Sequence, residues 1–179
     1  MDESLPLHYV PFNVKAIGND IVVTYVLHQE GSPLETDGPG LGFVDIFSST
    51  GRLLTRLEHG DWLNAPWGVV LAPLDFGRFS HDLLIGQFAG GGNTQSSGFI
   101  AAYDPATGKF DGLLRDASGN HWPSMASGRS ALGMSARTTA TVPLTLQRVY
   151  FTAGPNQQSQ GLFGFLTAIS AELIEGNDQ

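Results

Sequence analysis

Polar side chains that could bind a cation or another polar ligand lie in and between the apolar runs of this sequence. Carboxylate and amide oxygens suit hard cations such as calcium. The candidate residues are Asn13, Asp37, Asp61, Asn64, His121 and Asn156. Trp62 joins them because an exposed indole ring can stack on a sugar. No His-x-x-x-His or Asp-x-Asp-x-Asp-Gly spacing supports a metal, so solvated loop and turn residues remain the alternative.

Nucleophilic catalysis has no support in the residue pattern. The chain has no cysteine, which excludes disulfides, thiolate zinc sites and cysteine nucleophiles. The glycine run at 90–92 is not followed by the lysine or the helix start of a phosphate-binding loop. The pairs Ser97-Gly98 and Ser127-Gly128 lack the strand–turn–helix context of a hydrolase nucleophile. The residues therefore favour a protein that is not an enzyme.

The charge balance argues against nucleic acid as a partner. Acidic residues outnumber basic ones by 17 to 9, the formal net charge is −8, and only Lys15 and Lys109 are lysines. A surface that follows phosphates needs the opposite balance. No run of apolar residues is long enough for a membrane-spanning helix. Residues 1–4 have neither the basic nor the apolar region of an export signal, so no signal peptide is predicted in this chain.

The elements that must position these residues are repeated along the chain. Three units, at about 9–58, 64–115 and 130–170, contain short runs rich in Val, Ile, Leu, Phe and Tyr in the same order. The equivalent glycines Gly42, Gly98 and Gly161 are 56 and 63 residues apart. The 23 glycines and 10 prolines in 179 residues punctuate these runs and disfavour long helices.

Each unit is predicted to be a four-stranded antiparallel meander. Tight turns are predicted at 18–20, 48–51 and 104–108 from their Gly, Asn, Asp, Ser and Pro residues. The third unit lacks its fourth run, and the segment 170–175 fits either a short helix or an outer strand. Repeated meanders are typical of an all-β fold made of β-propeller blades, and three units correspond to about half of a six-bladed ring.

Strand alternation sorts the loops onto two edges of such blades. The longer connections, at 28–41, 58–65, 89–97, 115–130 and 154–160, share one edge, where binding residues usually lie. Asn13 belongs instead to an innermost strand, where it either packs near the axis or contacts a ligand. Asn64 either points to the channel mouth or caps the chain as it enters a strand. Trp62 is either a sugar platform or an anchor for its loop.

The chain resembles the NHL-type, TolB-like six-bladed β-propellers. The most specific segments are Asp-Gly-Pro-Gly-Leu-Gly-Phe-Val-Asp-Ile-Phe at 37–47, Leu-Asn-Ala-Pro-Trp-Gly at 63–68 and Tyr-Phe-Thr-Ala-Gly-Pro-Asn at 150–156. They are similar to an uncharacterised bacterial and fungal propeller family, many members of which carry predicted secretion signals. The resemblance implies that the chain matches the C-terminal three blades and that the full-length form is extracellular or envelope-associated.

Three functional hypotheses follow from this resemblance and from the residues. The first is a non-enzymatic scaffold that binds a protein or a glycan through the edge with the long loops. The second, by analogy of fold alone, is a calcium-dependent lactonase or esterase with its site over the channel. The third concerns assembly: three blades leave open strand edges, which either a missing N-terminal half or a second copy in a homodimer would cover.

Overall fold

The computed structural model describes residues 4–88, 99–119, 133–137, 148–154 and 161–168. Regular structure in this part of the chain is β-strand, apart from one 3-10 turn, η1, at Gly77–Phe79. The all-β prediction is therefore confirmed. Among these residues, no helix has the length and apolar character needed to cross a membrane.

The strands form three antiparallel sheets, and neighbours in sequence are neighbours in each sheet. The first sheet contains β1 (Tyr9–Ile17), β2 (Asp20–Leu27), β3 (Phe43–Ser48) and β4 (Leu53–Arg56). The second contains β5 (Pro66–Leu71), β6 (Leu83–Gln87), β7 (Ile100–Tyr103) and β8 (Phe110–Leu113). The third contains β9 (Gly133–Arg137), β10 (Arg148–Ala153) and β11 (Leu162–Leu166). The segment 170–175 lies outside the described residues.

The short turns depend on glycines that adopt positive φ angles. Gly18, with φ of 59°, lies in the two-residue turn between the paired residues Ile17 and Asp20. Gly108, with φ of 72°, closes the turn between β7 and β8, and its amide donates a 2.8 Å hydrogen bond to the Asp104 carbonyl. A residue with a Cβ rarely adopts this backbone conformation, so glycine suits both turns.

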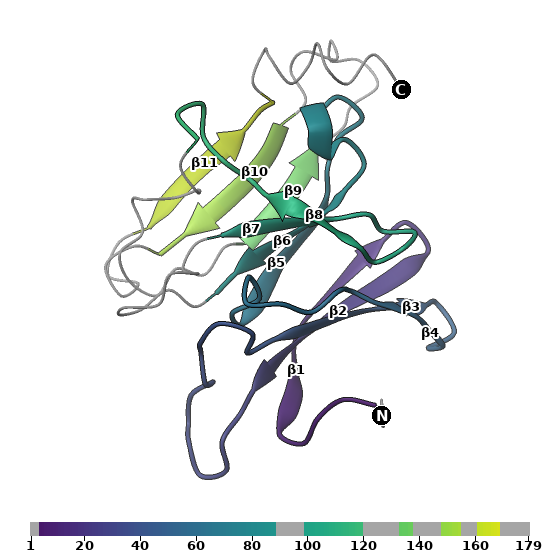
Figure 1. Cartoon of the computed structure of the whole chain (residues 1–179), viewed down its shortest axis with the longest axis vertical. Helices are drawn as coiled ribbons and strands as arrows, with labels where there is room; N and C mark the ends of the chain where they lie inside the picture. Colours follow the sequence, from purple (N-terminus) through teal and green to yellow (C-terminus); the bar gives the residue numbers. More distant parts are fainter. Residues whose placement is uncertain (1–3, 89–98, 120–132, 138–147, 155–160, 169–179) are drawn as a thin grey trace.

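The second sheet lies between the other two (Figure 1). Its side chains contribute to two hydrophobic cores, one on each face. Leu83 and Ile85 of β6 pack with the first sheet, whereas Leu84 packs with the third. Successive side chains of a strand point to opposite faces, so one strand serves both cores. Every residue of β6 is buried as a result. The sequence of such a strand does not alternate between apolar and polar residues, because both of its faces are buried.

The first and second sheets are built alike in detail. The pairing of β1 with β2 shifts register between Pro11 and Asn13, and that of β5 with β6 shifts at the equivalent Pro66 and Gly68. The backbone amide of Leu57 bonds to Val44, and that of Leu114 bonds to Ile100, each at 2.9 Å. These pairs occupy matching places in the predicted repeat.

The first strands of successive sheets lie beside one another. β1 contacts β5, and β5 contacts β9. The bulged residues Phe12 and Trp67 meet edge to face, with ring centroids 4.7 Å apart, and Phe88 joins them. The three sheets therefore meet along their first strands.

Candidate functional site

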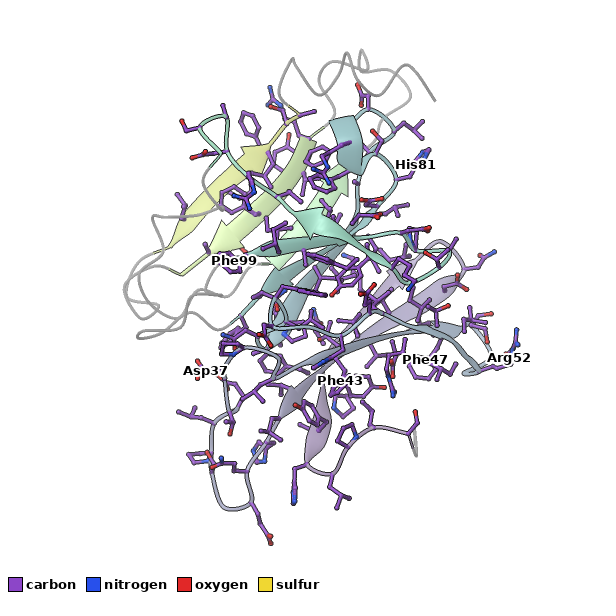
Figure 2. All side chains as sticks on the ribbon, in the orientation of Figure 1. Asp37, Phe43, Phe47, Arg52, His81 and Phe99 are labelled. Carbon is purple, nitrogen blue, oxygen red and sulfur yellow. The ribbon has the colours of Figure 1, made fainter. Side chains whose placement is uncertain are left out.

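The strand connections lie at two edges of the sheets. We call the edge with the β2–β3 connection (28–42) and the β4–β5 connection (57–65) the loop edge. The opposite edge carries the β1–β2, β3–β4, β5–β6 (72–82) and β7–β8 (104–109) connections, and we call it the turn edge. Figure 2 shows Asp37 of the loop edge and His81 of the turn edge on opposite sides of the molecule.

Asn64 joins the two connections of the loop edge. Its side chain is fully buried, and its Oδ1 accepts a 2.7 Å hydrogen bond from the Gly38 amide. The backbone amide of Asn64 donates to Gln87 Oε1 at 2.8 Å, and Leu41 forms a parallel bridge with Asn64. Nearby, His59 Nε2 lies 2.8 Å from the Gly40 carbonyl oxygen. Asn64 therefore acts here as a structural tie that holds 28–42 against 57–65.

Trp62 is half-buried, and two contacts hold its ring in place. Its Nε1 donates a 2.6 Å hydrogen bond to the Tyr103 hydroxyl, and its ring stacks on Phe110 at a centroid distance of 3.9 Å. Of the other predicted residues of this edge, Asp61 is exposed and Asp37 is half-buried. Asp37, Asp61 and Asn64 thus share the loop edge, but Asn64 is buried there and the ring of Trp62 is held against Phe110.

Asn13 lies on β1, where its side chain links the first two sheets. Its Nδ2 donates to the Trp67 carbonyl at 2.7 Å, and its Oδ1 accepts from the Val14 amide at 2.8 Å. His121 and Asn156 lie outside the described residues. Among the described residues, no three His, Asp or Glu side chains converge closely enough to hold a metal ion. The amide oxygens of Asn13 and Asn64 each accept a hydrogen bond, from the Val14 and Gly38 amides respectively.

A cavity that the sequence reasoning did not anticipate lies at the turn edge of the second sheet. It has a volume of about 510 Å³ and a polar lining. The lining residues are Arg78, Ser80, His81, Asp82, Asp104, Pro105 and Asp111. We call it the acidic cavity because three carboxylates line it.

Strand register brings the three carboxylates together. Leu83 of β6 pairs with Tyr103 of β7, so Asp82 and Asp104, one residue further out, follow on adjacent strands. Asp111 is the extra residue of a bulge in β8, because Ala102 pairs with Gly112 while Tyr103 pairs with Phe110. Bulges redirect side chains, and this one gives Asp111 its place in the lining.

Asp82 is the most perturbed of these groups. It is only 8 % exposed, and its buried Oδ2 has no hydrogen-bond partner among the described residues. Burial, followed by repulsion from Asp111 and Asp104, raises the pKa of Asp82 from 3.8 to about 6, and Arg78 opposes the rise. Asp104 differs because hydrogen bonds from the Thr107 hydroxyl and the Ala106 amide lower its pKa. Those bonds stabilise its charged form.

One signal in the sequence could have pointed to this cavity. The first unit joins its first two strands by the short turn at Gly18, whereas the second uses the eleven residues 72–82. A long insertion at one place of a repeat often carries function. The convergence of Asp82 with Asp111 could not be seen, because it depends on the strand pairing and on the bulge.

Proteins of Acanthamoeba polyphaga mimivirus are similar to this chain. Uncharacterized protein R640 is 31 % identical over 118 residues, which cover 65 % of this chain and 21 % of that protein. Uncharacterized protein R648 is 27 % identical over 163 residues (90 % and 36 %), and uncharacterized protein L690 is 27 % identical over 168 residues (92 % and 40 %). The chain therefore spans less than half the length of these relatives. No family model and no solved structure matches it.

Proposed function

We propose that the chain forms three consecutive blades of a β-propeller and acts as a non-catalytic scaffold that binds a protein through the loop edge. The observation that carries this proposal is the packing of three similar meanders along their first strands, with the middle sheet covered on both faces. Sheets in a propeller pack in this way around a channel. The resemblance to NHL-type, TolB-like propellers supports the same fold. With it we propose that the full-length protein is extracellular or envelope-associated.

The loop edge favours a protein partner over a glycan. Trp62, the residue best suited to stack on a sugar, already has one face of its ring stacked on Phe110. The exposed residues of the 28–42 connection include Pro33, Leu34 and Pro39, and Leu34 is 51 % exposed. Because Asn64 ties this connection to the neighbouring one, an apolar contact is presented with little loss of conformational entropy on binding.

Affinity capture with the purified chain, followed by titration of the purified captured protein, tests this proposal. We expect Leu34→Ser to weaken that binding about tenfold, the scale of one buried apolar contact. Leu74→Ser is the matched control, because Leu74 is 60 % exposed and belongs to the turn edge. Equal losses in both variants would contradict the proposal, and so would turnover of a lactone or ester panel. If the chain bound to a glycan array and Leu34→Ser abolished that binding, the ligand of the loop edge would be a glycan instead.

The alternative function, a calcium-dependent lactonase or esterase, rests on analogy of fold alone. A thermal-shift measurement with calcium chloride tests it directly. A shift that Asn13→Ala abolishes would favour it.

The exposed outer faces of the terminal sheets favour a second role, closure of a ring by two copies of this chain. On the third sheet, Tyr150 stacks on Phe163, and Phe163 and Phe165 are 71 % and 48 % exposed. On the first sheet, Val14 is 64 % exposed on the face that points away from the second sheet. A second copy that packed on these two faces would continue the stacking of sheets. Light scattering should then give twice the monomer mass, whereas a monomer at all concentrations would contradict closure.

A further inference from the structure

The charges of the acidic cavity do not balance. Asp82, Asp104 and Asp111 contribute three carboxylates, and Arg78 contributes the one permanent positive charge of the lining. Arg78 lies over the Phe79 ring at 4.7 Å, and its Nη2 donates a 3.0 Å hydrogen bond to the Asp111 backbone carbonyl rather than to its carboxylate. The cavity therefore keeps a net negative charge that a cationic ligand would compensate.

The fold itself does not require this cluster. The first sheet has the same register and the same bulge, and its residues equivalent to Asp82, Asp104 and Asp111 are Asp20, Ser48 and Leu54. The first sheet therefore forms the same strands and turns with a single carboxylate at these three places. The second sheet carries three carboxylates and the longer 72–82 connection, an arrangement that costs stability through repulsion.

Asp82 supplies an independent sign of a missing partner. Its side chain lines the cavity, yet it is more than nine-tenths buried, and its Oδ2 has no hydrogen-bond partner among the described residues. Buried polar atoms are nearly always hydrogen-bonded in folded proteins. A donor that enters from the cavity would restore both the hydrogen bond and the charge balance.

An organic cation suits the acidic cavity better than a metal ion does. No three acidic or histidine side chains of the described residues converge on one point, although three carboxylates line the same cavity of about 510 Å³. A guanidinium group matches this arrangement, because it is planar, carries several donors and bonds to carboxylates in pairs. It is also more weakly hydrated than an ammonium group, so it enters a partly buried site at a lower cost.

We propose that the acidic cavity binds a guanidinium-bearing organic cation, with Asp82 as its buried acceptor and Asp111 as its exposed one. The group comes either from a small molecule or from an arginine side chain of another protein. The site lies at the turn edge and does not depend on the proposed function of the loop edge. Asp104 contributes mainly charge, because its oxygens already accept bonds from Ala106 and Thr107.

Calorimetric titration of the full chain with butylguanidinium tests this proposal. We expect saturable binding that weakens with added salt, that falls by about tenfold or more in Asp82→Asn, and that falls less in Asp111→Asn. Asp20→Asn is the matched control, since it makes the same charge change at the equivalent place of the first sheet and should leave binding unchanged. Thermal melts of each variant establish folding, and the exposed Asp111 provides a second measurement if Asp82→Asn does not fold.

Further titrations distinguish the ligand class and its source. Neutral butylurea should not bind, and calcium chloride should not displace butylguanidinium. A blocked Gly-Arg-Gly peptide that binds more tightly than butylguanidinium would assign the site to a protein side chain, and one that binds equally or more weakly would assign it to a small molecule. Displacement by calcium, binding of butylurea, absence of saturable binding, or unchanged binding in Asp82→Asn would each overturn the proposal.

Discussion

At the scale of single residues, Asp82 is held where its charge is disfavoured. Its folded pKa of about 6 lies above the ordinary value of 3.8, so the folded chain holds this proton more tightly than the unfolded chain does. Protonated Asp82 therefore contributes most to the free energy of unfolding in acid, and this contribution is lost as the pH rises from about 4 to 6. A shift of this size is worth about 1–2 kcal/mol after allowance for solvent at the cavity.

The variant Asp82→Asn should remove this pH dependence, because the amide has the same shape and no charge. We expect its free energy of unfolding to exceed that of the wild type by about 1 kcal/mol at pH 8 and to match it near pH 4. Urea titrations across this range measure the difference. Arg78, His81, Asp104 and Asp111 line the cavity in both proteins, so the difference at each pH reports on the charge of Asp82 and its interaction with them. A variant less stable than the wild type at pH 8 would contradict the burial of a charged Asp82.

At the scale of elements, the contact between the first two sheets depends on Gly42. A Cβ at Gly42 would lie 2.2 Å from Cδ of Pro66, the first residue of β5. The proline ring is part of the backbone and cannot rotate away, so Gly42→Ala must push β5 from the first sheet. We expect a loss of about 2–3 kcal/mol in the free energy of unfolding. At Gly161, the equivalent glycine of the third unit, a Cβ would have no heavy atom of the described residues within 4 Å.

Gly161→Ala is therefore the matched control, with an expected change within about 0.5 kcal/mol. Denaturant unfolding of both variants measures the difference. Equal losses would show that the glycines matter for turn formation rather than for the approach of one sheet to the next.

At the scale of the whole molecule, assembly should depend on the aromatic face of the third sheet. If a second copy covers this face, Phe163→Ser should shift the population from dimer to monomer, because about 2 kcal/mol or more of apolar burial is lost. Light scattering over a concentration series measures this shift. Leu74→Ser removes a comparably exposed apolar side chain from a connection and should leave the mass unchanged. A dimer that survives Phe163→Ser would place the interface elsewhere.

The sequence by itself determined the local elements of this protein. Short β-branched and aromatic runs between glycine-rich turns predicted strands, and the repeat predicted meanders, because both signals come from residues close together in the chain. It also placed Asp37, Asp61 and Asn64 on one edge through strand alternation alone. Only the tertiary structure decided what the side chains contact. The ring of Trp62 is held in place because Phe110 and Tyr103, far along the chain, provide its stacking and hydrogen-bonding partners. The acidic cavity arose because strand register and one bulge bring Asp82, Asp104 and Asp111 together, and such long-range convergence leaves no local pattern.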